Sequence, residues 1–333
     1  MQSLAPVGLL MAASMSVTNV LTDVARKHAL AKRELIPATL WIRIAVTTVF
    51  ALALVWRIAS GAPPVIHDVP LFLMYLTLDV ALITCVMWLY FRALQLSPLS
   101  MSVPFLAFTP VFLIPSGYIM LGELPPPIKL LGVVLIVTGS LAMHRRLFAI
   151  GWLAPVKAVI QEKGSRYMLM VSLLFAITNP LDKKLVVMSD IFTEAFSYGL
   201  GLCLAFFIWG KLQHADFRAA ARGNVKWISL AGLLDAVSLL FQLGSYAYIA
   251  VVITVSIKRA GIILSVLAGW LFFREREITD KLIAASVMFC GVLILYLPLS
   301  TEQAFAVTGL TLAGMAAGLF LTRRQEAETA HGG

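Results

Sequence analysis

The sequence predicts an all-α polytopic membrane protein with two inverted five-helix repeats and an eleventh helix near the C-terminus. Three observations lead to this prediction. The 333 residues are 60% hydrophobic and only 13% charged, whereas soluble domains average roughly 25% charged residues. Apolar runs of about 20 residues, each long enough to cross a bilayer as a helix, recur along the chain. Several features of the first half return at matching spacing in the second half.

The helices are expected at the apolar runs, because a segment in lipid must satisfy its own backbone hydrogen bonds. They are predicted at 6–25, 38–56, 70–91, 101–121 and 128–143, then at 167–188, 191–209, 226–248, 251–273 and 281–298. The domains are a first repeat at 5–145, a polar linker at 146–166, a second repeat at 167–298, an extra helix at 304–321 and a polar tail at 322–333. An odd number of helices per half gives the two halves opposite orientations, as in many transporters.

Paired features in the two halves indicate an internal duplication. They are Leu78-Asp79 with Leu234-Asp235, Tyr90 with Tyr246, Glu123, Lys129 and Gly139 with Glu275, Lys281 and Gly291, and Thr18-Asn19 with Thr178-Asn179. The halves also differ, since Pro104, Pro110 and Pro115 should kink the fourth helix while the ninth has no proline.

The basic residues predict the orientation in the membrane. Eighteen Lys and Arg residues fall on one predicted side, in 26–33, 145–166, 211–226, 274–281 and 323–324, against four on the other side, Arg57, Lys129, Lys183 and Lys184. Because basic loops stay in the cytoplasm, we expect the N-terminus outside. The helix at 304–321 returns the C-terminus inside, and its Gly314-x-x-x-Gly318 spacing suits close packing.

Ionisable residues inside lipid mark candidate sites, because they are costly there and normally face the bundle interior. Lys258 and Arg259, in the ninth helix, are the sharpest example. Two cations in a low dielectric can bind an anion, and Arg can hold a carboxylate or phosphate through two hydrogen bonds. The alternatives are ion pairs with Asp79 or Asp235, or side chains that reach toward the interface.

The carboxylates Asp79 and Asp235 have two interpretations that the sequence leaves open. They could carry protons and so couple or gate transport. They could instead be structural partners of Arg43, Lys258 or Arg259. Other ionisable groups near helix ends are Asp23, Asp182, Lys183 and Lys184.

Polar residues at matching positions complete the candidate substrate site. Asn19 and Asn179 each follow a threonine, and Pro180 should free a backbone carbonyl nearby. Helix-to-helix hydrogen bonding is the alternative role of both amides. Tyr90 and Tyr246 could line a cavity, although packing explains such aromatics more often. The substrate-binding candidates are therefore Lys258, Arg259, Asn19, Asn179, Tyr90, Tyr246 and Arg43.

Enzyme signatures are scarce. The five histidines fall in predicted loops or helix ends, without metal-ligand spacing, and neither a phosphate-binding loop nor a nucleophile elbow occurs. We therefore predict no catalytic residues, no metal and no cofactor. The net charge of +9 is expected to orient the protein in the membrane rather than bind nucleic acid.

Two stretches resemble the EamA-type repeats of the drug/metabolite transporter superfamily. The first comprises Leu99 to Pro104, Pro110, Gly117 to Glu123, Gly132 and Gly139, and the second Ser256 to Arg259, Gly269-Trp270 and Arg274-Glu275. The resemblance covers residues 5–298 and implies two inverted repeats around a central cavity that works by alternating access. Lys258-Arg259 also resembles the pair with which triose-phosphate translocators hold phosphate. The chain departs from the family in Arg274, Ile262, the extra helix and the outside N-terminus.

The sequence thus predicts a secondary active or exchange transporter for a small polar, anionic metabolite. One alternative is an exporter or flippase of amphipathic, lipid-linked or cationic compounds, and another is a membrane scaffold or intramembrane enzyme. The expected location is the bacterial inner membrane. The expected partners are a small-molecule substrate and membrane lipid, with a homodimer left open.

Overall fold

The computed structural model describes most of the chain. Three sequence features lie outside the described residues: residues 146–162 of the predicted linker, the segment Leu99–Ser102, and the second-repeat motif of Ile262, Gly269, Trp270, Arg274 and Glu275. The described residues are 5–30, 34–97, 103–124, 126–142, 163–222, 224–261, 264, 267, 271, 278–297 and 299–331.

Helices form the whole of the described structure apart from short connections. They are α1 (Ala5–Leu30), α2 (Leu35–Ala59), α3 (Val69–Leu96), the 3₁₀ helix η2 (Val103–Phe108), α5 (Thr109–Leu121), α6 (Pro127–Ala142), α9 (Lys163–Met188), α10 (Ile191–Leu212), α11 (Phe217–Ala221), α12 (Val225–Tyr246), α13 (Val251–Ala260), α15 (Ile278–Tyr296) and α16 (Thr301–His331). Within these ranges, five helices are long and apolar enough to cross a membrane, namely α1, α2, α3, α10 and α12. The predicted all-α polytopic membrane fold is confirmed.

The helix ends differ from the predicted ones by a few residues, mostly because polar ends extend each helix beyond its apolar run. The extra helix shows the largest difference: α16 continues to His331, through the segment predicted as a polar tail. The last residues of the predicted linker, 163–166, belong to α9. The short α11 was not predicted, and Asp216 caps its N-terminus.

Prolines break the fourth predicted helix as expected. The chain begins this element as η2, and α5 starts at Thr109 with Pro110 in its first turn, where a missing N–H costs nothing. Pro115 lies inside α5. The helix ends at Gly122, whose φ of +69° is a left-handed conformation that glycine adopts freely.

Pro180 has the predicted effect on α9. Proline cannot donate to the carbonyl four residues earlier, and that carbonyl, on Ala176, accepts a hydrogen bond from Ser116 Oγ at 2.5 Å. A side chain of α5 thus satisfies the backbone group that Pro180 leaves unpaired. The missing backbone hydrogen bond is thus replaced by a hydrogen bond between α5 and α9.

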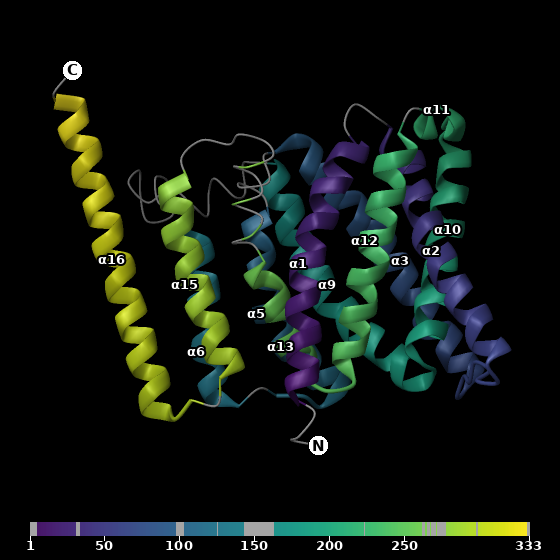
Figure 1. The fold of residues 1–333 in the computed structure, drawn as a ribbon, viewed down its shortest axis with the longest axis horizontal. Coiled ribbons are helices and arrows are strands. Elements are labelled where there is room, and N and C mark those ends of the chain that lie inside the picture. Colours follow the sequence, from purple (N-terminus) through teal and green to yellow (C-terminus); the bar gives the residue numbers. More distant parts are fainter. Residues whose placement is uncertain are drawn as a thin grey trace.

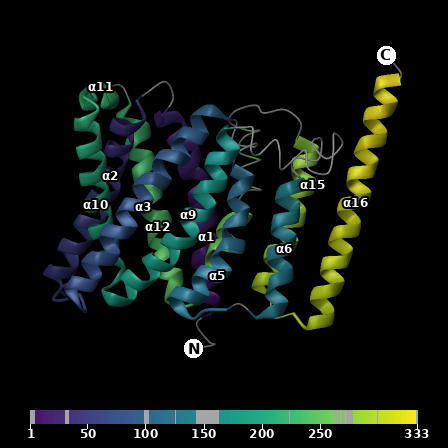
Figure 2. The same ribbon diagram turned by 180° about the vertical axis from the view of Figure 1, so that it is seen from behind.

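The helices pack in reciprocal pairs (Figures 1 and 2). α1 packs against α12 and α13, and α3 packs against α9 and α10. The pairs α2 with α10 and α6 with α15 also lie side by side. The helices α6 and α15 approach closely, since a Cβ on Gly139 would lie 2.7 Å from the Ala284 carbonyl oxygen.

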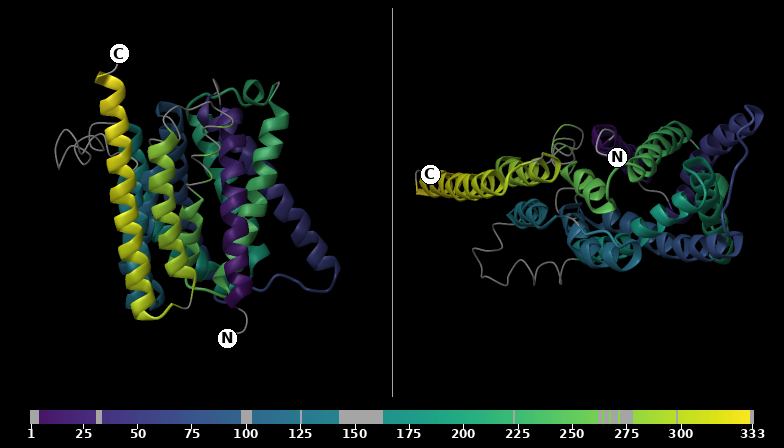
Figure 3. Two further views of the ribbon diagram at one scale, coloured as in Figure 1. Left: turned by 60° about the vertical axis from the view of Figure 1, so that its left-hand side comes forward. Right: turned by 90° about the horizontal axis from the view of Figure 1, so that it is seen from below.

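The last helix, α16, lies at the edge of the bundle and packs on α15 and α6 (Figure 3). The expected close packing through Gly314-x-x-x-Gly318 is only partly present. Gly318 faces Ile283, whereas no described atom lies within 4 Å of the position that a Cβ on Gly314 would occupy. The two chain ends lie at opposite ends of the bundle (Figure 1).

Candidate functional site

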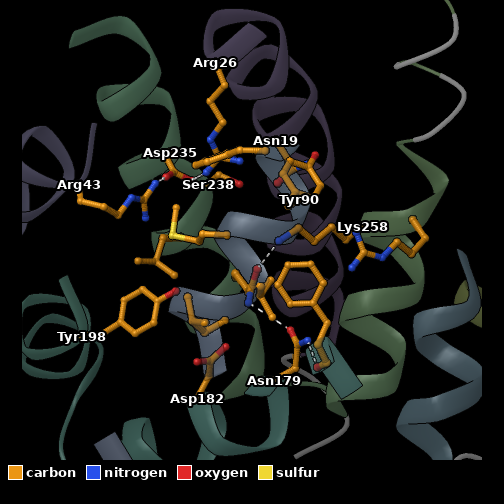
Figure 4. A pocket seen from close by; sticks show the side chains of 18 residues that line it. Asn19, Arg26, Arg43, Tyr90, Asn179, Asp182, Tyr198, Asp235, Ser238 and Lys258 are labelled. Carbon is orange, nitrogen blue, oxygen red and sulfur yellow. Dashed lines mark hydrogen bonds and ion pairs between the residues drawn. The ribbon is translucent and has the colours of Figure 1, made fainter. Parts of the chain in front are cut away.

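A polar cavity lies inside the bundle, between helices from both halves of the chain (Figure 4). Its volume is about 110 Å³, enough for a small solute or several waters. Polar and charged side chains reach it from seven helices. Six of these helices supply Asn19 and Arg26 (α1), Arg43 (α2), Tyr90 (α3), Asn179 and Asp182 (α9), Tyr198 (α10), and Asp235, Ser238 and Gln242 (α12). Lys258 and Arg259 enter it from α13.

The cavity gathers most of the predicted site residues. Seven of them line it: Asn19, Arg43, Tyr90, Asn179, Asp235, Lys258 and Arg259. Tyr246 lies just behind this wall and reaches it through its hydroxyl. Asp79 is fully buried outside the lining, next to Asp182.

The two cations of α13 point to different neighbours. Lys258 Nζ donates to Gln242 Oε1 at 2.7 Å. The Arg259 guanidinium lies over the Phe175 ring, 5.3 Å from its centroid. Among the described residues, neither cation forms an ion pair with Asp79 or Asp235, as one alternative would require. No ion pair joins either positive charge to a carboxylate in the part of the chain that the structure describes.

Asp235 forms ion pairs with two other cations. Its Oδ1 lies 2.7 Å from the Arg26 guanidinium, and its Oδ2 forms an ion pair with Arg43. Arg26 also pairs with Asp23 at 3.2 Å. This buried network joins α1, α2 and α12, in the geometry expected of the structural interpretation.

A second network of neutral groups lies on the opposite side of Lys258. Asn179 Oδ1 accepts hydrogen bonds from the Tyr246 hydroxyl at 3.0 Å and from Gln242 Nε2 at 3.4 Å. Gln242 Nε2 also lies 3.0 Å from the Tyr246 hydroxyl. The Asn179 side-chain amide donates to the Phe175 carbonyl within α9. The chain of contacts continues through Gln242 to Lys258, so it can fix the position of the ammonium group.

The contacts revise the matching of residues between the two halves. The Tyr246 hydroxyl donates to Asn179, and the Tyr90 hydroxyl donates to Asp23 at 2.9 Å. Each tyrosine lies 67 residues beyond its partner. By these contacts the counterpart of Asn179 is Asp23, one helical turn beyond the Asn19 that the sequence pattern suggested. Asn19 donates to Asp23 at 3.3 Å and supports that position.

Several cavity residues were not among the predicted site residues, although Asp182 was noted from the sequence as an ionisable group. Gln242, Arg26, Tyr198 and Asp182 all line the cavity. Asp182 and Gln242 carried a signal, because a buried carboxylate or amide inside an apolar run needs a partner. Tyr198 and Arg26 carried none, since an aromatic residue and a basic helix end are common features of membrane helices.

The fold and its polar cavity define a multi-pass membrane protein with a solute-sized site between its helices. Residues 6–144 match the EamA-like transporter family, which confirms the resemblance for the first predicted repeat. That family consists of membrane transporters of small molecules, and the match agrees with this coarse function. The matched residues span α1, α2, α3, α5 and α6.

The fold also has a solved relative. A crystal structure of a protein aligns with a TM-score of 0.62 over 87% of this chain and 96% of its own, at 14% identity. At that identity the likeness shows the fold alone. No curated protein matches the sequence.

Proposed function

We propose that the protein is a secondary active or exchange transporter for a small anionic metabolite, which binds to Lys258 and Arg259 in the central cavity. The charge balance of the cavity carries this proposal. Four cations line it, Arg26, Arg43, Lys258 and Arg259, against two carboxylates, Asp182 and Asp235. Two arginines already neutralise Asp235. An anionic substrate would supply the charge that Lys258 and Arg259 lack.

The neighbouring groups suit the recognition of such an anion. Arg259 can donate two parallel hydrogen bonds to a carboxylate or phosphate, while Lys258 acts as a point charge. Gln242 holds Lys258 Nζ at 2.7 Å, which limits the entropy lost when the ammonium binds a ligand. Asn179 and Tyr198 add neutral hydrogen-bonding groups at the cavity wall. A small polar metabolite with one anionic group fits this arrangement.

Alternating access is supported by the way the helices pair. Under the proposed duplication α1 is the counterpart of α9, α2 of α10, and α3 of α12. The contact of α1 with α12 in one direction is therefore repeated by the contact of α9 with α3 in the other, and α2 contacts its own counterpart α10. This reciprocity favours two inverted repeats around the cavity. Two ion-pair systems connect the halves: the buried Arg26–Asp235–Arg43 network, and the half-buried pair of Lys183 with Glu123 at 2.5 Å. Breaking and remaking them would accompany the change of access.

The proposed orientation has the N-terminus outside and the C-terminus in the cytoplasm of a bacterial inner membrane. The excess of Lys and Arg on one side is the main support. The opposite positions of the two chain ends agree with an odd number of crossings (Figure 1).

A transport assay with matched variants tests the proposal. The purified protein is reconstituted in liposomes, and exchange is measured for carboxylates, phosphorylated compounds, amines and lipid-linked probes. We expect an anion to be exchanged and the Lys258→Ala/Arg259→Ala variant to lose at least tenfold in rate. Lys226→Ala, at an exposed position, is the control and should exchange normally. Exchange of only amines or lipids, unaffected by the double substitution, would overturn the proposal in favour of the alternative exporter or flippase.

A further inference from the structure

We propose that Asp79 and Asp182 form a proton-binding site beside the cavity, so that the transporter carries a proton together with its anion. The coupling to an anion rests on the proposed function, whereas the proton site stands on its own residues. Two buried carboxylates from different helices meet here without a cation of their own.

The geometry buries the two carboxylates on neighbouring helices. Asp79 is 0% exposed on α3, and Asp182 is 7% exposed on α9. The helices α3 and α9 pack side by side, and the two carboxyl groups are close enough to interact electrostatically. Asp182 also lines the cavity (Figure 4), so the pair is connected to the substrate site.

The hydrogen-bond inventory indicates that a proton is needed. Among the described residues, no N–H or O–H group donates to either oxygen of Asp79. Asp182 can satisfy it only if one of the two carboxyl groups is protonated, because an ionised carboxylate is an acceptor alone. Two adjacent like charges in a low dielectric also cannot both stay ionised at low cost. A shared proton resolves the unmet hydrogen bond and the repulsion together.

The charged neighbours strengthen this conclusion. Glu194 on α10 is 1% exposed, faces the same pair, and its Oε2 has no hydrogen-bond partner among the described residues. Thr178 Oγ1, one turn before Asp182 on α9, is also buried and without a partner there. Among the described residues, the other titratable groups that interact electrostatically with the pair are Tyr198 on α10, Tyr246 on α12 and Lys258 on α13.

The nearby cations are already engaged elsewhere. Arg43, on α2, is paired with Asp235, and Lys183 is paired with Glu123. Lys258 Nζ donates to Gln242. None of these three forms an ion pair with Asp79 or Asp182 in the part of the chain that the structure describes. The contrast with Asp235 is sharp: it occupies the matching sequence position but lies between two arginines.

The shared cavity explains how proton and anion would be coupled. Lys258 and Asp182 both line it. When Asp182 is ionised, its charge offsets that of Lys258 and weakens the binding of an anion. When Asp182 is protonated, the positive charge of Lys258 is available. Proton and anion therefore favour each other's binding, and by linkage the effect is reciprocal.

Infrared spectroscopy of the full-length protein in detergent tests the site without any substrate. A protonated carboxylic acid has a carbonyl stretch separate from the bands of ionised carboxylates. We expect this band in the wild-type protein at neutral pH, and its loss in both Asp79→Asn and Asp182→Asn. Glu194→Gln identifies any component from Glu194. The control is Asp216→Asn, which changes an exposed carboxylate and should leave the band unchanged.

Either of two outcomes overturns the proton site: no such band in the wild type, or a band that survives both substitutions. The wild-type spectrum alone can decide the first outcome, even if a variant fails to fold.

A second measurement tests the coupling of proton and anion transport. In liposomes loaded with inorganic phosphate, Asp182→Asn should lose at least tenfold in uptake driven by a pH gradient, whereas Asp216→Asn should take up phosphate at the wild-type rate. Failure of Lys258 and Arg259 to bind anions would remove the coupling while leaving the band, so the two proposals fail separately.

Discussion

Asp235 Oδ1 lies 2.7 Å from the Arg26 guanidinium, so a buried ion pair joins α12 to α1. Arg43, on α2, binds the other carboxylate oxygen. One carboxylate therefore holds two arginines and three helices together beside the cavity. Removing a single partner from such a network leaves uncompensated charge in a low dielectric.

Asp235→Asn is expected to destabilise the protein strongly. The substitution preserves shape but leaves Arg26 and Arg43 without their shared counter-ion, at a cost of about 3–5 kcal/mol. Unfolding of the purified protein in mixed detergent, followed by circular dichroism, measures the change. Asp216→Asn is the matched control, since Asp216 is exposed. Equal stability of the two variants would contradict the structural role of Asp235.

Glu123, just after the end of α5, is expected to stabilise the packing of α9 and α13 there. Its Oε1 lies 2.5 Å from Lys183 Nζ, and its Oε2 accepts the Val251 N–H at 3.2 Å, at the start of α13. Glu123→Gln and Lys183→Ala should each destabilise the protein, with a coupling energy of about 0.5–3 kcal/mol in a double-mutant cycle.

Exchanging the two charges separates the roles of Glu123. In the Glu123→Lys/Lys183→Glu variant the ion pair can form again, but lysine cannot accept the Val251 N–H and is unfavourable at a helix N-terminus. We expect only partial recovery of the melting temperature relative to Glu123→Lys alone. Full recovery to the wild-type value would show that the contact with α13 contributes nothing.

The seam between α6 and α15 is expected to tolerate no added methyl group. A Cβ on Gly291 would lie 2.6 Å from the Gly132 carbonyl oxygen, and one on Gly139 would lie 2.7 Å from that of Ala284. Gly139→Ala or Gly291→Ala should therefore cost about 1–3 kcal/mol through overpacking. Gly314→Ala, where a Cβ meets no described atom within 4 Å, is the control and should be neutral or slightly stabilising. Thermal melts of the three variants compare these effects.

Tyr246→Phe is expected to weaken substrate binding more than stability. Its hydroxyl contacts Asn179 and Gln242, and Gln242 holds Lys258. Loss of one hydrogen bond, worth about 1 kcal/mol, should raise the KM for anion transport roughly fivefold. Tyr248→Phe, at a 40% exposed position, is the control. An unchanged KM in Tyr246→Phe would separate this network from the substrate site.

The sequence predicted the membrane fold well because helix formation in lipid depends on local composition. Apolar length identified α1, α2, α3, α10 and α12, and Pro180 correctly indicated a freed carbonyl. Paired charges in lipid also directed attention to Lys258 and Arg259, which enter the cavity.

The pairing of side chains could not be read from the sequence, because it depends on which helices meet. Asp79 and Asp235 look equivalent along the chain, yet one meets a carboxylate and the other two arginines. Asn19 matched Asn179 by its neighbouring threonine, but the tyrosine contacts favour Asp23. A shift of one helical turn keeps the same helix face, so the pattern alone does not distinguish the two.

Anion binding at Lys258 and Arg259 is the central claim, and a thermal-shift titration tests it most directly. The melting temperature of the purified protein is measured with inorganic phosphate, a dicarboxylate and a primary amine, beside Lys258→Ala/Arg259→Ala and Lys226→Ala. Binding to the folded state stabilises it by about 2.7 kcal/mol at a ligand concentration 100 times the Kd. We predict that an anion raises the melting temperature of the wild type and of Lys226→Ala, but not of the double variant. Equal stabilisation of the double variant, or stabilisation by the amine alone, would contradict the proposed site.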